Sequence, residues 1–332
     1  MADPLCGVLI VSNGFLSCTL TMDLLSSYVR KFTKLKRGNV QGMKAPHKPV
    51  LLLAVIDGIE KKNIRSNQIQ ISPELVANFK DFWSQLVRDS RFSENFSLPF
   101  FHLRSDGFWH LQTLPGREIS LTSSHSIKSF THLKEVINYA CFDQELYNLL
   151  SNEHTRQILK QTLLDAYFPN THLHASNQLI GEIINQILHE PSAIYKTKAL
   201  NFDEEEVFVR SGVFKKEIPK IYNHTCAISR MRIITDADIQ MIDACHIVPF
   251  SQSHDDTITN GISLCPNLHR AFDRGLISLD GEYRVLVKPF KEQENFYSIK
   301  QFEARQILLP NSNHYFPAQE NLAAHRLRHN FY

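Results

Sequence analysis

The sequence predicts an α+β protein of two domains, the first mostly helical and the second built from short strands and helices. Three observations support this. The chain has 332 residues, and a single core usually stops growing before about 250 to 300 residues. Apolar residues recur at helical spacing through most of the first 170 positions. Beyond about position 225 the apolar runs are short and lie beside turn signals such as Asp280-Gly281.

Composition and charge exclude several classes. With 43% hydrophobic and 21% charged residues, the chain has the composition of a globular protein rather than a disordered, collagen-like or membrane protein. The net charge is only +2, so a nucleic-acid surface would have to come from local clusters of Lys and Arg. Six cysteines without a CxxC pair indicate a reduced, cytoplasmic protein. Apart from the apolar start, no run of about 18 apolar residues suggests a membrane span.

The first domain is expected over residues 22–170. Residues 1–21 are apolar but have Asp3 where a signal peptide carries its basic region, so they form an N-terminal extension of uncertain status. An amphipathic helix with a basic outer face follows Met22. Pro49 begins a helix that is apolar nearly all round, hence buried, and that runs to about Lys61, and Ser72 caps another helix. The two aromatic runs that flank the turn at residues 105–107 predict a hairpin, and residues 123–168 return to helical patterns.

The remaining chain divides into a linker with a connecting helix, residues 171–206, and a second domain, residues 207–332. An interrupted helix opens the second domain, and the apolar segment that ends in DACHIVPF predicts a strand. Asp280-Gly281 predicts another hairpin. The polar loop that contains His254, Asp255 and Asp256 is expected to be solvated rather than functional.

His246, Asn260 and His269 stand in this order within AcHIvP and NGisLcpnLHraFDrGliSLD. On these motifs the stretch from Cys226 to about Val287 resembles the HNH nuclease family. The resemblance implies a ββα-metal fold, in which two strands and a helix surround one divalent ion. It also implies that the domain hydrolyses phosphodiester bonds.

Phosphodiester hydrolysis needs a base that takes a proton from water and a cation that stabilises the departing oxygen. His246, on the strand, is the predicted base. Asn260 is predicted to fix the neighbouring loop through side-chain bonds to the backbone. The resemblance assigns His269 and Asp273 as metal ligands, and their spacing places them on one face of a helix.

The third metal ligand differs from the family pattern. The family commonly has an acid or a histidine just before the base, whereas this chain has Cys245. Strand alternation places Asp243 on the same side as Cys245, so Asp243 could substitute for it. We favour the carboxylate with Mg²⁺ or Mn²⁺, while a thiolate would favour Zn²⁺. A separate zinc knuckle around Cys226 and Cys265 lacks the usual paired cysteine spacing.

Residues 22–168 resemble the DNA sulfur-binding domain of McrA-like, phosphorothioate-dependent restriction endonucleases, on the motifs APHKPVLLLAVIDGI and LPFFHLRSDGFWHL. The resemblance implies an apolar cup for sulfur, which is larger and less hydrated than oxygen, and nearby cations for the remaining charge. The family usually has a tyrosine before the proline and often an arginine after the histidine, where this chain has Leu98 and Lys48. The expected contacts are Leu98, Pro99 and Phe100 in the cup, His47 and Lys48 on a cationic rim, and Arg104 on a phosphate.

The leading hypothesis is therefore a metal-dependent endonuclease that cuts double-stranded DNA near a phosphorothioate. An HNH nuclease for another DNA modification and a DNA-binding regulator with an inactive nuclease domain are the alternatives. A double-strand break would require a homodimer or two separate events. A zinc deaminase is excluded, because neither HxE nor PCxxC occurs.

Overall fold

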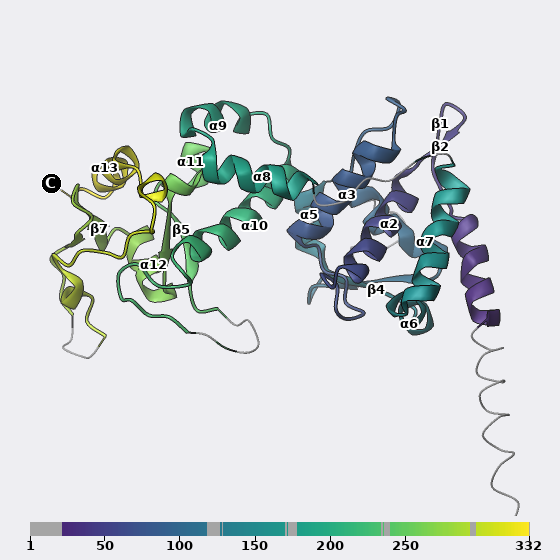
Figure 1. Cartoon of the computed structure of the whole chain (residues 1–332), viewed down its shortest axis with the longest axis horizontal. Helices are drawn as coiled ribbons and strands as arrows, with labels where there is room; N and C mark the ends of the chain where they lie inside the picture. Colours follow the sequence, from purple (N-terminus) through teal and green to yellow (C-terminus); the bar gives the residue numbers. More distant parts are fainter. Residues whose placement is uncertain are drawn as a thin grey trace, which may run out of the picture. The chain divides into compact units, whose positions relative to one another are not determined.

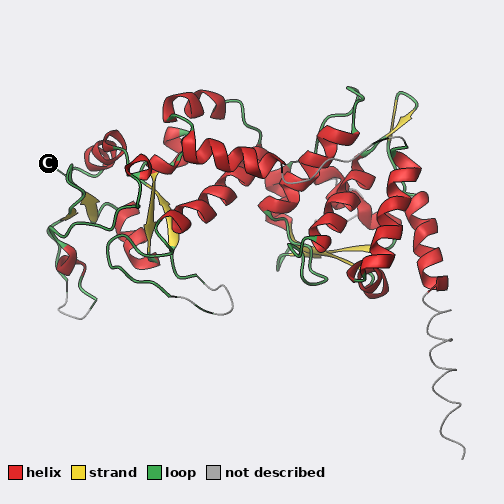
Figure 2. Cartoon of the chain, in the orientation of Figure 1, coloured by secondary structure: helices red, strands yellow, loops and turns green. Residues whose placement is uncertain are grey.

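The computed structural model describes residues 22–117, 127, 129–169, 171, 178–233, 235, 240–292 and 297–331. The predicted N-terminal extension, residues 1–21, lies outside the described residues. The chain forms two compact units, Met1–Leu179 and Ile180–Tyr332 (Figure 1). Helices dominate, and the strands form short antiparallel pairs in both units, so the predicted α+β class is confirmed (Figure 2). No helix in the described ranges is long and apolar enough to cross a membrane.

Helix α2 (His47–Glu60) forms the centre of the first unit. Every residue from Lys48 to Ile59 is buried, because α3 (Pro73–Leu86), α4 (Ser97–His102), α6 (Gln144–Ser151) and α7 (Glu153–Tyr167) all pack against α2. The buried helix predicted after Pro49 is thus confirmed. Ser72 caps α3 as expected, since its side chain accepts a hydrogen bond from the backbone N–H of Leu75 at 3.2 Å.

The remaining elements of the first unit surround this core. Residues 22–33 form the amphipathic helix, and β1 (Asn39–Val40) pairs with β2 (Met43–Lys44) just before α2. Strand β3 (Trp109–Thr113) pairs with the distant β4 (Ile137–Phe142), which follows α5 (Phe130–Val136).

The hairpin predicted around residues 105–107 is wrong. The first aromatic run forms α4, and a 3-10 turn, η1 (Leu103–Asp106), follows it. Helical spacing lets Phe96 and Phe100 stack at 5.3 Å between ring centroids, which stabilises a helix instead of a strand. Gly107, with φ of 76°, ends the turn in the left-handed region, where a glycine is favoured.

The second unit begins in the connecting helix. Helix α8 (Gln178–His189) spans the boundary between the units, and α9 (Ser192–Ala199) follows within the segment predicted as a linker. The predicted interrupted helix is one continuous helix, α10 (Glu204–Ile221), with Pro219 in its last turn.

A two-stranded sheet and a helix follow α10. Strand β5 (Asp243–His246) pairs with β6 (Gly261–Leu264), α11 (Phe250–Ser253) and η3 (Ile258–Asn260) lie between them, and α12 (Pro266–Asp273) follows β6. This is the strand, loop, strand and helix order expected for a ββα fold. Helix α10 packs on both strands, and α12 packs on β5.

Gly261 permits the close packing of α10 on β6. A Cβ atom at this position would lie 2.0 Å from Cδ1 of Ile218 and 3.0 Å from the ring of Phe214. Both contacts are shorter than van der Waals distances, so a side chain here would push α10 away from the sheet.

The end of the chain forms a second small sheet. Strands β7 (Ile277–Leu279) and β8 (Val285–Val287) form the hairpin that Asp280-Gly281 predicted. Asp280 stabilises its turn by accepting hydrogen bonds from the backbone N–H groups of Glu282 and Arg284. The short turns η4 (Ile299–Phe302) and η5 (Asn313–Tyr315) lead to α13 (Gln319–Arg328), which packs on β7.

Candidate functional sites

The predicted metal ligands of the second unit converge between β5 and α12. One potential donor atom from each of Cys245, His269 and Asp273 lies within 4.8 Å of the other two. Nε2 of His269 lies 3.3 Å from a carboxylate oxygen of Asp273, one helical turn later. Nδ1 of His269 lies 3.3 Å from Oδ2 of Asp243. Asp243 therefore contacts the cluster through His269, while Cys245 is the strand residue that belongs to it.

These residues differ in their exposure to solvent. Cys245 is fully buried, whereas the side chains of His269 and Asp273 are 26% and 53% exposed. Burial raises the pKa of the Cys245 thiol, and the carboxylate of Asp273 raises it further. The thiol donates a long hydrogen bond to that carboxylate, at 3.7 Å. A thiol, an imidazole and a carboxylate are ligand types of divalent transition metals, so these residues could hold one such ion.

His246 points to the opposite side of β5, toward α10. Its ring stacks on Phe214 with 3.9 Å between the centroids and 5° between the planes. Nε2 forms a hydrogen bond of 2.7 Å with Oδ1 of Asp256. The side chain remains 21% exposed, so water can reach part of the ring.

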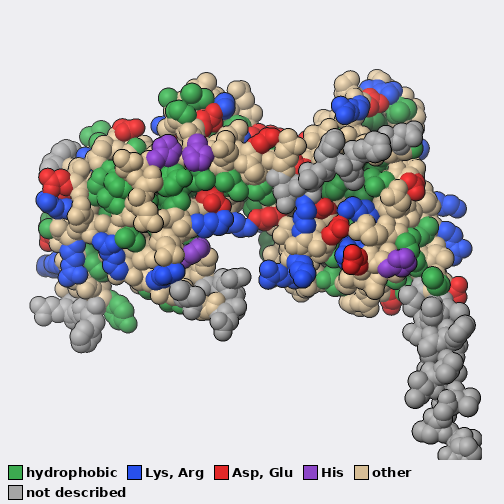
Figure 3. All heavy atoms as spheres, in the orientation of Figure 1, with side chains coloured by type: hydrophobic (Ala, Val, Ile, Leu, Met, Phe, Trp, Pro, Cys, Tyr) green, Lys and Arg blue, Asp and Glu red, His purple; other side chains and the backbone are tan. Residues whose placement is uncertain are grey.

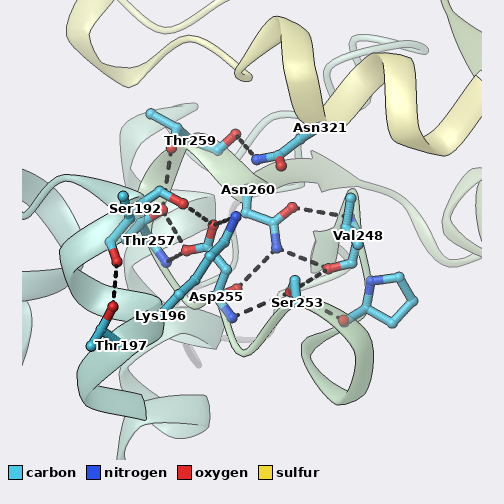
Figure 4. A network of polar contacts seen from close by, with 12 residues as sticks. Ser192, Lys196, Thr197, Val248, Ser253, Asp255, Thr257, Thr259, Asn260 and Asn321 are labelled. Atoms are coloured by element: carbon cyan, nitrogen blue, oxygen red, sulfur yellow. Dashed lines mark hydrogen bonds and ion pairs between the residues drawn. The ribbon is translucent and has the colours of Figure 1, made fainter. Parts of the chain in front are cut away.

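Asn260 connects the end of β5 to the following loop (Figure 4). Its side-chain amide donates to the backbone carbonyls of Val248 and Asp255 at 2.8 and 2.9 Å, and its carbonyl oxygen accepts from the N–H of Val248 at 2.9 Å. Asn260 is completely buried, and its bond to Asp255 is shielded from water, whereas the two bonds to Val248 are partly buried.

The prediction that the loop residues 254–256 are solvated is wrong for both aspartates. Asp255 and Asp256 are 0% and 1% exposed. Buried carboxylates require compensating partners, and Asp255 finds them in Ser192 and Lys196 of α9 and in Thr257 (Figure 4). No local pattern in the sequence indicates these α9 partners, because α9 lies about 60 positions earlier.

Cys226 and Cys265 lie beside each other and share a hydrogen bond. This bond lowers the pKa of the Cys226 thiol and raises the pKa of the Cys265 thiol. The third residue near them is Ser229, whose backbone N–H donates to the sulfur of Cys226 at 3.4 Å. Within the described residues they belong to no group of three metal-binding side chains. A zinc knuckle would need further ligands.

The first unit has a cavity of about 420 Å³ beside the start of α2. Leu98, Pro99, His47 and Lys48, all predicted for the sulfur site, line it. Phe100 does not: it is completely buried and packs edge-to-face on Trp109. The sequence analysis missed the other lining residues, which are Lys36, Arg37, Gly38, Asn39, Val40, Ala45, Phe92, His102 and Ser105.

The charges around this cavity differ from the predicted cationic rim. Nζ of Lys48 is buried in an ion pair with Asp106, at 2.6 Å, and also donates to Ser105. His47 packs against Trp83, and burial lowers its pKa, so it is mostly neutral at neutral pH. Burial therefore disfavours the cationic form of His47, and its role on the rim stays a prediction. Arg104 lies over the ring of Phe101, at 4.1 Å, and does not line the cavity.

Further cations lie next to the cavity. A shallow depression is lined by Arg30, Lys31, Lys34 and Lys36, together with Ser27 and Asp106. Lys36 also lines the cavity, and Asp106 forms the ion pair with Lys48 beside it. The basic face of the first helix therefore continues to the mouth of the cavity. On the face drawn in Figure 3, Lys and Arg side chains and Asp and Glu side chains are scattered among hydrophobic and other residues.

Each of the two units contains a region that matches a family model. Residues 226–280 match the family model described as HNH endonuclease. Residues 25–179 match the family model described as the ScoMcrA-like DNA sulfur-binding domain. The first unit is thus similar to a DNA sulfur-binding domain, and the second unit contains a region similar to HNH endonucleases.

The chain is also similar to solved structures, whereas no curated protein matches it. The sulfur-binding domain of ScoMcrA complexed with phosphorothioated DNA is 24% identical, over 46% of this chain and 92% of that chain, with a TM-score of 0.34. The phosphorothioation-dependent restriction endonuclease ScoMcrA is 11% identical over 74% of this chain and 94% of that chain, with a TM-score of 0.34. The modification-dependent restriction endonuclease TagI is 20% identical over 35% of this chain and about a third (36%) of that chain, with a TM-score of 0.26.

Proposed function

We propose that this chain is a modification-dependent DNA endonuclease. Its first unit binds double-stranded DNA that carries a phosphorothioate, and its second unit hydrolyses a phosphodiester bond nearby. The observation that carries the proposal is that regions similar to both domain families occur in one chain, one with a cavity and the other with a cluster of potential metal ligands at the expected motif.

The cavity in the first unit suits a phosphorothioate. Leu98 and Pro99 offer apolar surface to the sulfur atom, which is poorly hydrated and gains from leaving water. Lys36 and Arg37 at the same cavity balance the charge that remains on the phosphate. An ordinary phosphate would lose hydration against the apolar surface and gain less, so the cavity discriminates between the two.

In the second unit we assign His246 as the general base that takes a proton from the attacking water. Asn260 holds the loop after β5 in place through its three hydrogen bonds. Cys245, His269 and Asp273 are the proposed metal ligands. When bound, a divalent cation would hold the scissile phosphate and stabilise the charge on the departing oxygen.

The ligand set bears on the choice of metal. The strand residue in the cluster is Cys245, and thiolate suits Zn²⁺ and other transition ions far better than Mg²⁺. Asp243 then takes a supporting role, because its contact with Nδ1 of His269 would orient Nε2 toward the ion. We therefore expect activity with transition metals to exceed activity with Mg²⁺, in contrast to the preference drawn from a carboxylate ligand.

A cleavage assay tests the proposal directly. Two plasmids of the same sequence, one phosphorothioated and one unmodified, are incubated with the full chain and with Zn²⁺, Mn²⁺ or Mg²⁺, and excess EDTA serves as the control. The expected result is cutting that is confined to the phosphorothioated plasmid and abolished by EDTA. Selective binding without cutting in any metal would instead identify a regulator with an inactive nuclease domain. Equal binding and cutting of both plasmids would refute sulfur recognition.

A further inference from the structure

Asp256 is a buried carboxylate that directly contacts the proposed base. It lies in the loop between α11 and η3, is 1% exposed, and its Oδ1 lies 2.7 Å from Nε2 of His246. Oδ2 has no hydrogen-bond partner among the described residues. Since burial of a charged carboxylate costs free energy, the imidazole is the partner that compensates for it.

The loop on both sides of Asp256 is fixed by other hydrogen bonds (Figure 4). The side chain of Asp255 accepts from Ser192 at 2.6 Å and from the backbone and hydroxyl of Thr257 at 2.9 and 2.7 Å. The backbone carbonyl of Asp255 accepts from Asn260. Asp256 therefore stands between two anchored residues, which limits how far its carboxylate can move.

The imidazole is restrained as well. His246 is held by β5 through its backbone, by the parallel ring of Phe214 on α10 and by Asp256 at Nε2. The described residues offer Nδ1 no hydrogen-bond partner. A carboxylate accepts but does not donate, so the ring must carry its proton on Nε2, and the lone pair of the neutral ring is then on Nδ1.

We propose that Asp256 is the positioning residue of the nuclease site, which fixes the Nε2–H tautomer of His246 and makes Nδ1 the proton acceptor. This inference rests on the proposed function. In the reaction, an O–H bond of the attacking water breaks and its proton moves to Nδ1. The water oxygen bonds to phosphorus, the bond from phosphorus to the departing sugar oxygen breaks, and that oxygen takes a proton from solvent. Asp256 stabilises the imidazolium that forms.

The amide variant Asp256→Asn separates this role from a purely structural one. The asparagine has the same shape and can turn its NH₂ group toward Nε2, which would move the ring proton to Nδ1 and leave no base. In a Ser-His-Asp triad the equivalent change lowers kcat by about 10⁴ through the wrong tautomer. For the full chain with Mn²⁺ and phosphorothioated duplex, we expect kcat to fall by about 10²- to 10⁴-fold while KM changes less than about threefold.

Ser192→Ala is the matched control, because it removes a hydrogen bond from the same loop without touching His246. It should lower the melting temperature and retain kcat to within about threefold. If Asp256→Asn also retains kcat to within threefold, or if it lowers kcat no more than Ser192→Ala does, the positioning role is overturned.

The tautomer can be measured without any variant at Asp256 and without DNA. ¹⁵N NMR of histidine-labelled protein, with the signals of His246 identified by their loss in His246→Gln, should show a protonated Nε2 and an unprotonated Nδ1 at pH 8. A protonated Nδ1 would overturn the proposal even if Asp256→Asn fails to fold. If the unmutated chain shows the Nε2–H tautomer but cuts no DNA in any metal, the proposed nuclease function fails and the catalytic role of Asp256 fails with it, while the hydrogen-bond assignment stands.

Discussion

The two candidate sites hold their charged groups in opposite ways. In the first unit, Lys48 and Asp106 are paired with side chains only 9% and 4% exposed, and His47 beside them is mostly neutral. In the second unit, His269 and Asp273 are partly open to solvent around a single buried thiol. A site that must distinguish sulfur from oxygen needs apolar surface and neutralised charge, whereas a site that must bind an ion needs accessible electron pairs. The difference in burial thus follows the difference in chemistry.

The largest effect is expected when the second site loses its base. His246→Ala should lower the cleavage rate by about 10²- to 10⁴-fold, because no other group accepts the proton from water. Binding of phosphorothioated DNA should stay within about twofold, since the cavity lies in the other unit. Cleavage is followed on labelled duplex, and binding by fluorescence anisotropy. Undiminished cutting by the variant in Mn²⁺ would refute the assignment of the base. Because the change leaves Asp256 without its partner, the melting temperature of the variant is measured in parallel.

A smaller effect should distinguish recognition from general attraction in the first site. Leu98→Ala removes apolar surface from the cavity and should weaken binding of phosphorothioated duplex by about tenfold, with little change for plain duplex. Lys36→Gln, at the cavity mouth, should weaken both duplexes by a similar, smaller factor and reduce the salt dependence of binding. Both variants are compared by anisotropy titrations at two salt concentrations. A loss of the same size for both duplexes with Leu98→Ala would show that the cavity does not select sulfur.

A separate effect, on stability and not on DNA binding or cleavage, concerns the pH dependence of folding. His325 in α13 is buried, stacks on Phe272 at 3.7 Å and hydrogen-bonds Ser278, and burial lowers its pKa to about 3. In the unfolded chain its pKa is about 6.5. Because the folded state resists protonation of His325, the stability that depends on this histidine being neutral is fully present above pH 6.5. It declines by about 1.4 kcal/mol per pH unit as the pH falls toward 3.

Urea unfolding of the full chain at several pH values, followed by circular dichroism, measures this decline. The variant His325→Gln should be less stable at pH 7.5 and show a flatter decline below pH 6.5. Tryptophan fluorescence is the internal control, because Trp83 and Trp109 both lie in the first unit, where the replacement should have no effect. Equal slopes for the two proteins by circular dichroism would show that His325 does not account for the acid sensitivity.

The elements that the sequence predicted correctly have strong local signals. The long, mostly apolar run after Pro49 favours a buried helix, Ser72 followed by proline is a local cap, and Asp280-Gly281 closes its hairpin with bonds to its own turn. The HNH motif likewise placed His269 and Asp273 on one helical face within a few residues of each other.

The errors came from contacts between distant parts of the chain. Asp106-Gly107 has the local signature of a hairpin, but the carboxylate is taken by Lys48 and by the backbone of Lys36. Asp256 was predicted to be a solvated loop residue because its partner, His246, lies ten positions away on a strand. No helical or strand spacing relates a strand residue to a residue in the loop that follows it. Neither pairing can be derived from local spacing, because each depends on how helices and loops pack in three dimensions.

The close packing of α10 on β6 at Gly261 determines how much of the chain has to be kept when the second unit is transferred to another protein. The region that matches the family model starts only at Cys226, yet Phe214, which stacks on His246, and Ile218, which covers Gly261, both belong to the preceding helix. A fragment cut at the motif boundary would expose β6 and free the imidazole. Anyone who fuses this nuclease to another DNA-binding domain would therefore need to carry α10, and α9 with its bond to Asp255, as part of the module.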